Sequence, residues 1–422
     1  MTPITNKDLD DWTKETSGPV ALRLRQKLLP VEESGIIFPP TYADIGYNID
    51  MLSDGICVAT IDSVGSQANR LEPIFKSESK AASDWLVPQV EIVIRQEACG
   101  ECQTCQENVG DRKKADKECK KKRDVTRSLL DLAHRAADAV VQSSPELRKL
   151  VAPAFMKLQK GDAGPLCAIA PTSLVFGVWD SRGCTGEKRP RLVRSIIRAW
   201  HVEPLHAAAQ FNSIWKLLDE GQREELKKEA KAKKTDLSEK GLADAPATFR
   251  RVSPTAQKHM NEFRDGSPNP ERRVLGGVRV NGAIERDVTV NLVALRGLRG
   301  ENDGETTAIR NYLLALALKA ATADIELFLR EGCLLRYAEN GDAWHRVPRR
   351  GEPEAIDLRA DAIAEYATAA AEHFRAKWPE VFKGKWPKEE GKAPELRYEF
   401  DLKEAKKLLE KKAAEEETAQ AG

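Results

Sequence analysis

The chain has 422 residues, and 32% of them are charged, yet 67 Lys and Arg residues almost balance 66 Asp and Glu residues. This balance excludes a protein that binds nucleic acid through bulk positive charge, so any such surface must be a local basic groove. No apolar run could span a bilayer, and the polar N-terminus lacks the apolar segment of a secretory signal. We therefore expect a cytoplasmic protein without a membrane partner, whose eight cysteines are reduced thiols or metal ligands.

After one helix predicted within the polar residues 1–35, strands are predicted at 55–63 (GICVATIDS) and 88–95 (PQVEIVIR), because both runs are rich in β-branched residues. SQANRLE follows the first strand, and its polar side chains could hold a ribose-phosphate in a turn. The alternative is a helix that begins here with Ser66 as its N-cap, and both can hold because a helix N-terminus attracts anions. The side chains concerned are Ser66, Gln67, Asn69 and Arg70.

A Cys- and Lys-rich insertion is predicted at 96–123. It contains Cys99-x-x-Cys102-x-x-Cys105 and, thirteen residues later, Cys119. Four thiols at this spacing favour a closed, structural Cys₄ zinc site, since a short polar insertion has little apolar area to bury. An iron–sulfur cluster and a loop of unligated thiols are the alternatives. The apolar residues of 124–142 then recur at helical spacing and predict an amphipathic helix.

The segment 173–199 (SLVFGVWDSRGCTGEKRPRLVRSIIRA) predicts a strand at 173–179, a polar loop, and a helix after Pro190. Arg191, Arg194 and Arg198 have the spacing of one helix face, which suits a phosphate backbone because guanidinium groups match phosphate oxygens. The alternative is a solvated charged helix. The candidate contacts are Ser181, Arg182, Lys188, Arg189, Arg191, Arg194 and Arg198.

The remaining chain predicts a solvated charged helix at 213–234, loops at 235–273, and a hairpin at 274–295 with Asn281-Gly282 as a type I′ turn. A long apolar helix at 305–330 should be the main buried one, and 331–337 should add a strand. These elements predict an α/β or α+β core with insertions at 96–123 and 201–270. We expect domain boundaries at 1–335 for this core and at 336–422 for a charged helical C-terminal region.

Several blocks together resemble the backbone subunit of type I-G (formerly I-U) CRISPR surveillance complexes, the Csb-one group of the Cas-seven superfamily. They span about residues 55–335 in the expected order. The blocks are DSVGSQANRLE (62–72), LVFGVWDSRG (174–183) with RLVRSIIRA (191–199), LSEKGLADAP (237–246), GGVRVNGAIERDVTVNLVALRGLR (276–299) and the helix from Tyr312 to Cys333.

The resemblance implies an α+β fold: an RRM-like (ferredoxin-like) palm with a β-hairpin thumb, for which 96–123 and 274–295 are the candidates. It implies several copies bound along one guide RNA (crRNA), which pairs with a target DNA strand in antiviral defence. Other Cascade subunits (a large subunit and a fused guide-processing subunit) and a recruited helicase-nuclease are the further partners. The protein itself is expected to be non-enzymatic.

Two other functions remain open from the sequence. Asp180 in the WDSRG loop could serve a metal-dependent ribonuclease, although an Asp at this place is more often a turn former. The cysteine insertion could belong to a zinc-dependent nucleic-acid-binding scaffold outside CRISPR.

Overall fold

The structure is a computed structural model, and it describes most of the chain. Cys99, most of the block 237–246 and most of the insertion 201–270 lie outside the described residues. The described residues are 2–14, 16–42, 46–95, 102–108, 110, 114, 118–119, 124–183, 185–207, 214–235, 237, 240, 242, 274–386 and 392–408.

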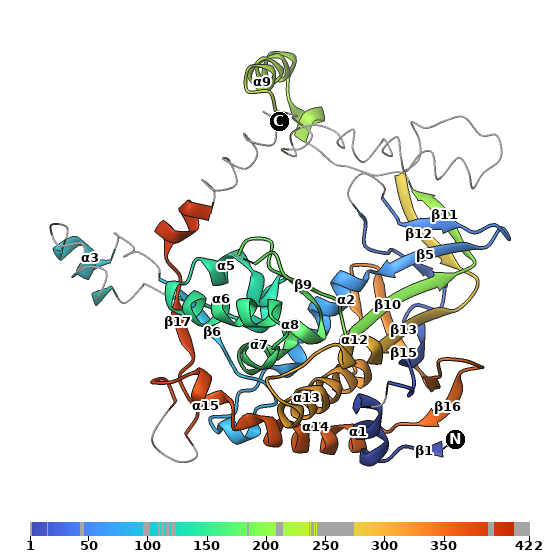
Figure 1. Cartoon of the computed structure of the whole chain (residues 1–422). Coiled ribbons are helices and arrows are strands. Elements are labelled where there is room, and N and C mark those ends of the chain that lie inside the picture. Colours follow the sequence, from blue (N-terminus) through green and yellow to red (C-terminus); the bar gives the residue numbers. More distant parts are fainter. Residues whose placement is uncertain are drawn as a thin grey trace, which may run out of the picture.

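A nine-stranded, curled sheet forms the centre of the fold (Figure 1). Its order is β1-β16-β15-β2-β13-β10-β5-β4, β14 pairs with β15, and the ladders are antiparallel except β1 with β16. β5 and β15 confirm the strands predicted at 55–63 and 331–337, and β15 crosses residue 335. The strands are β1 (Thr2–Pro3), β2 (Ala21–Pro30), β4 (Ile49–Met51), β5 (Cys57–Asp62), β10 (Val193–Trp200), β13 (Ile284–Asn291), β14 (Phe328–Arg330), β15 (Cys333–Val347) and β16 (Glu354–Asp357).

One face of this sheet is packed against helices. In β2 the residues Leu22, Leu24 and Leu28 are buried, and their neighbours point to the other face because side chains alternate along a strand. α13 confirms the predicted buried helix, although it ends at Thr322 and not at Arg330. The covering helices are α1 (Asn6–Lys14), α2 (Val64–Leu71), α12 (Leu292–Arg296) and α13 (Asp303–Thr322), with α14 (Ala360–Arg375) packed on α13. The fold is therefore a mixed α+β fold, as expected.

A helical lobe lies beside the sheet (Figure 1). β6 confirms the strand predicted at 88–95. The prediction of one continuous helix at 124–142 is wrong. Ser128 and Asp138 accept backbone N–H groups two residues ahead, so each starts a short turn where a continuous helix was expected. The elements are β6 (Glu91–Ile94), β7 (Val125–Ser128), β17 (Arg397–Glu399), α3 (Gln103–Glu107), α5 (Ala139–Gln142), α6 (Pro145–Gln159), α7 (Gly164–Ile169), α8 (Pro171–Val175) and α15 (Trp378–Val381).

Two predictions in the segment 173–199 are also wrong. The residues from Pro171 to Val175 form the helix α8, and the strand there is only β8 (Val178–Trp179), paired with β9 (Lys188–Arg189). α8 is buried on all sides, so its sequence has no helical periodicity to detect. The expected arginine helix is the strand β10, which pairs with β13 and β5. Its apolar residues Val193, Ile196 and Ile197 are β-branched, and the two sheet ladders outweigh the helical spacing of the arginines.

The predicted hairpin at 274–295 is replaced by a longer, bent ribbon. β10 and β11 (Val202–Ala207) run against β13 and β12 (Val274–Val280), and β12 also pairs with β3 (Ile36–Ile37). At the bend, the backbone N–H of Gly282 donates to the carbonyl of Trp200 at 3.1 Å. A Cβ on Gly282 would lie 2.7 Å from that oxygen, so the glycine allows the two strands to approach closely. The predicted type I′ turn at Asn281-Gly282 is therefore wrong. The ribbon leads into residues 208–273.

Two hydrophobic clusters stabilise the fold. The larger lies between the helices and one end of the sheet, and the smaller lies at the other end, around Leu28, Ile197 and Ile284. Outside them, α9 (Glu220–Ala232) has no buried residue, which confirms the solvated helix predicted at 213–234. In the described part of the chain, no helix has the length and apolarity needed to cross a membrane.

Candidate nucleic-acid interface

The side chains of SQANRLE lie on the helix α2 and not in a turn. Ser63 is the N-cap, and its hydroxyl accepts the backbone N–H of Ser66 at 3.3 Å, so the predicted cap is displaced by three residues. Gln67 is fully buried, whereas Asn69 is exposed and Ser66 is partly exposed. Arg70 donates to the carboxylate of Asp62 at 3.2 Å, which ties α2 to the end of β5. This motif is therefore in large part structural.

Gln67 belongs to a buried polar layer that separates the two hydrophobic clusters. Its amide donates to Asp62 at 2.6 Å, and its carbonyl oxygen accepts from the hydroxyl of Ser195 at 2.7 Å and from Arg286. The guanidinium of Arg286 also donates to the Gln26 side chain at 2.5 Å and to the backbone carbonyls of Ala320 and Ala323. Burial lowers the pKa of Arg286, and the carbonyls at the end of α13 favour its positive charge.

Arg194 and Arg198 lie four residues apart on β10, so they share the face of the sheet opposite the helices. In the strand registers, Thr289 of β13 lies between Arg194 and Arg23. In the same way, Glu285 lies between Arg198 and Lys27. Arg23 and Arg25 pair with Asp287 at 3.1 and 3.6 Å. The face formed by Arg23, Arg25, Lys27, Arg194 and Arg198 with Glu285 and Asp287 is thus basic on balance; we call it the open sheet face.

The open sheet face contains residues that the sequence analysis missed. Arg23, Arg25 and Lys27 alternate with Leu22, Leu24 and Leu28 in the run ALRLRQKLL. That alternation is the signal of a strand with one wet and one buried face, and it could have identified them.

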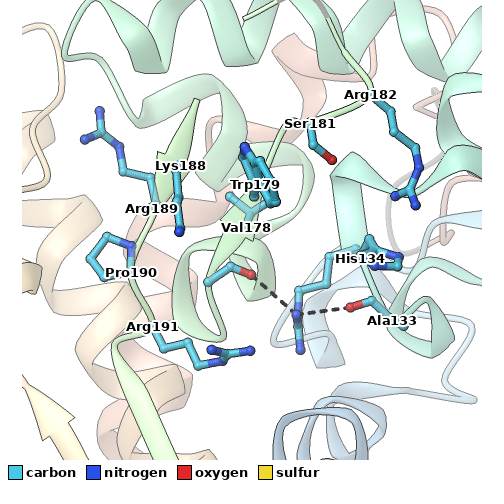
Figure 2. Close-up of a pocket in the computed structure, with 12 residues that line it drawn as sticks. Ala133, His134, Val178, Trp179, Ser181, Arg182, Lys188, Arg189, Pro190 and Arg191 are labelled. Atoms are coloured by element: carbon cyan, nitrogen blue, oxygen red, sulfur yellow. Dashed lines mark hydrogen bonds between the residues drawn. The ribbon is translucent and has the colours of Figure 1, made fainter. Parts of the chain in front are cut away.

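The remaining candidates gather at a pocket beside the β8–β9 pair (Figure 2). The pocket has a volume of about 370 Å³ and is lined by Ala133, His134, Arg135, Gly177, Val178, Trp179, Ser181, Arg182, Lys188, Arg189, Pro190 and Arg191. Figure 2 shows Trp179 in the middle, with Arg182 and His134 on one side and Lys188 and Arg189 on the other. The structure thus brings five of the predicted side chains together here. They are Ser181, Arg182, Lys188, Arg189 and Arg191.

Within this pocket the cations have different surroundings. Arg189 donates to the carbonyl of Leu158 at 2.9 Å and pairs with Glu187 at 3.1 Å, so it holds the β9 strand to α6. Lys188 lies over the ring of Trp179, with its ammonium 5.5 Å from the ring centre. Arg182 and Arg191 are exposed and have no ion-pair partner among the described residues.

Asp180 is buried and not exposed as a catalytic loop carboxylate would be. It is 2% exposed, and it accepts the backbone N–H of Thr185 at 3.2 Å and its hydroxyl at 2.6 Å. A Cβ on Gly183 would lie 1.9 Å from its Oδ1, so the glycine allows the loop to close over the carboxylate. This geometry matches the turn-forming alternative.

Three cysteines of the insertion converge. The Sγ atoms of Cys102, Cys105 and Cys119 all lie within 4.8 Å of one another, and Cys102 is 3.3 Å from Cys105 and 3.8 Å from Cys119. A tetrahedral zinc with four thiolates at about 2.3 Å has sulfur–sulfur edges of about 3.8 Å, so these thiols fit three corners of such a site. Cys99, the fourth predicted ligand, lies outside the described residues.

Comparison with known proteins identifies a family over part of the chain. Residues 22–204 match the family model described as CRISPR-associated protein GSU0053. The matched segment contains α2, the three clustered cysteines, the pocket and β10. It confirms the resemblance to a CRISPR-associated family that the motifs predicted. None of the curated proteins compared with the chain matches it.

Proposed function

Because residues 22–204 match the family model described as CRISPR-associated protein GSU0053, we propose that the chain is a non-enzymatic backbone subunit of a CRISPR surveillance complex. Several copies bind one guide RNA through its phosphates, so that any spacer sequence fits and the target DNA strand can pair with the exposed bases. The family match is the observation that carries this proposal. The further partners are the other Cascade subunits and the recruited helicase-nuclease.

The arrangement of cations supports contact with a guide strand at two places. Arg191 at the pocket and Arg194 on the open sheet face are three residues apart, about 10 Å of extended chain. We assign guide contacts to Asn69, Ser66, Ser181, Arg182, Lys188, Arg191, Arg194 and Arg198, whereas Gln67, Arg70 and Arg189 support them from within.

The bent ribbon supports the second of the two thumb candidates. It extends the sheet through β11 and β12 and leads into residues 208–273. A β-ribbon in this position can reach over RNA bound to a neighbouring copy, and we propose it as the thumb. The palm is the nine-stranded sheet with its helices.

We also propose a structural zinc held by Cys102, Cys105 and Cys119, with Cys99 as the fourth ligand. The convergence of thiols supports this assignment. The same three thiols also support a second candidate function, a zinc-dependent nucleic-acid-binding scaffold outside CRISPR.

The deciding experiment is the mass of the complex after co-expression with guide RNAs of two spacer lengths. A helical backbone predicts that mass rises in whole-protomer steps as the spacer lengthens. A fixed protomer number, or no copurified RNA, contradicts the backbone assignment and favours the zinc-dependent scaffold.

A ribonuclease activity is tested separately by incubating the purified complex with labelled guide and target RNA and Mg²⁺. Intact RNA is expected, because Asp180 is buried and hydrogen-bonded to Thr185. Cleavage that disappears in Asp180→Asn would contradict the non-enzymatic assignment.

A further inference from the structure

The pocket beside β8 and β9 has a shape that phosphate-backbone binding alone does not require. It is a concave site of about 370 Å³, and none of its lining residues is acidic. A strand that passes over a surface needs only a row of cations. A hollow of this volume with cations on its walls suits a ligand in which one compact anionic group is attached to a larger uncharged group.

A buried guanidinium forms part of the pocket wall. Arg135 is only 4% exposed and has a left-handed backbone, with φ of 55°. Its Nε lies 2.6 Å from the carboxylate of Glu72, and its Nη1 donates to the carbonyls of Ala133 and Gly177. Its Nη2 is buried and has no hydrogen-bond partner in the described part of the chain.

An unpartnered N–H of a buried cation is costly unless a ligand satisfies it. Arg135 lines the pocket, so its positive charge attracts an anion placed there. The exposed guanidinium of Arg182 and that of Arg191 line the same pocket and can contribute further donors.

The other notable feature is an exposed indole. Trp179 is 59% exposed, whereas Trp85 is 4% exposed in the core. Its backbone is held by the pairing of β8 with β9, and its ring is contacted by the ammonium of Lys188. An aromatic ring presented in this way is a stacking platform, and bases stack on such rings with little dependence on sequence.

We propose that this pocket holds one nucleotide of a bound strand, its phosphate against Arg135, Arg182 and Arg191 and its base stacked on Trp179. The inference rests on the proposed nucleic-acid function and deepens it. It separates this subsite from the open sheet face, where Arg194 and Arg198 lie on β10.

The test is calorimetric titration of the guide-free protein with AMP, dAMP, ribose 5-phosphate and inorganic phosphate. We expect AMP to bind at least about tenfold more tightly than ribose 5-phosphate, from stacking on the indole. Trp179→Ala should abolish that difference and Trp179→Phe should keep most of it. The double variant Arg182→Ala/Arg191→Ala should weaken binding of AMP and of ribose 5-phosphate alike.

Arg359→Ala is the matched control, because it removes an exposed arginine that pairs with Asp361 outside the pocket and should leave AMP binding unchanged. Tighter binding of AMP than of dAMP would assign the nucleotide to RNA. Equal binding of the two would assign it to the phosphate and base contacts that RNA and DNA share. The guide-bound complex should no longer bind AMP if a guide nucleotide occupies the pocket.

Several results would overturn the inference. They are equal binding of AMP and ribose 5-phosphate, unchanged AMP binding in Trp179→Ala, or AMP binding that persists in the guide-bound complex. These readouts are independent of how many protomers assemble on a guide, so the subsite and the backbone assignment can fail separately.

Discussion

The buried guanidinium of Arg286 is central to how this fold is held together. It satisfies the side chains of Gln67 and Gln26 and the last carbonyls of α13 at once. It therefore connects β13, β2, α2 and the helix C-terminus in the layer between the two hydrophobic clusters. Such a network stabilises one arrangement of the sheet and helix only while every acceptor has its donor.

We expect Arg286→Met to lower the free energy of unfolding by about 3 kcal/mol, because several buried acceptors lose their donor at once. Urea unfolding of the isolated protein measures this. Arg279→Ala, which removes an exposed arginine from the neighbouring β12, should change stability by less than about 0.5 kcal/mol. Equal midpoints for the two variants would show that the network contributes little.

Glu72 makes stability depend on pH. Burial raises the pKa of this carboxyl to about 7, even though Arg135 and Thr172 act in the opposite direction. The folded protein therefore holds this proton over a pH range in which the unfolded chain, with a carboxyl pKa near 4.5, releases it. The contribution of Glu72 is most favourable below the unfolded pKa, and it declines as pH rises toward about 7.

Glu72→Gln removes this titration. Between about pH 4.5 and 7, the free energy of unfolding of the wild type should therefore decline more steeply with pH than that of the variant. Chemical unfolding at closely spaced pH values measures the two slopes. Glu203→Gln, at an exposed position on β11, should keep the wild-type slope. Parallel curves for Glu72→Gln and wild type would contradict the shifted pKa.

At the scale of elements, the described part of the cysteine insertion has little apolar support. α3 has five residues, and its only buried residue is Cys105. Metal binding can supply the folding free energy that so small an apolar area does not. The three thiols on and around α3 are placed to hold a metal ion, which would crosslink this segment.

Purified protein should contain about one zinc per chain by elemental analysis, and Cys102→Ser or Cys105→Ser should lose it, because three ligands hold the ion poorly. Cys57→Ser, which changes a half-buried thiol outside the insertion, should retain the metal. Iron with visible absorption would identify a cluster in place of zinc. Protein that takes up no metal when zinc is supplied would exclude both.

At the scale of the whole molecule, near-neutral net charge is compatible with a strong local basic track. The cations of the open sheet face and of the pocket are collected by folding from β2, β10 and the β8–β9 loop. Acidic residues elsewhere balance them, so the net charge of +1 gives little non-specific attraction for polyanions.

Arg191→Ala/Arg194→Ala should weaken guide RNA binding almost equally for different spacer sequences, because phosphates carry no sequence information. The slope of log affinity against log salt should fall by about 1.4 per protomer if two single-strand phosphate contacts are lost. Filter binding at several salt concentrations measures both. Arg359→Ala, which removes an exposed arginine paired with Asp361, should leave affinity and slope unchanged.

Local sequence determined several of these features. Residues close together in the sequence were enough to predict four features. They are the strand β5 from its β-branched run, the helix α13 from its apolar residues, the helix α9 from its charges, and the thiol cluster from the cysteine spacing. The resemblance to a CRISPR-associated family was also visible in the sequence, because it rests on short ordered blocks, and a family model matches residues 22–204. The basic loop that lines the pocket was identified from its composition.

Only the tertiary structure decided the rest. The arginine segment at 191–198 has helical spacing, yet it is a strand because β13 and β5 supply ladder partners from distant parts of the chain. Gln67 reads as a polar ligand, yet it is buried against Ser195 and Arg286. Asn281-Gly282 reads as a turn, yet it is the bend of a ribbon. Hydrogen-bond partners, burial and pocket shape are set by residues far away in sequence, so local pattern determines which chemistry is present and folding determines where it acts.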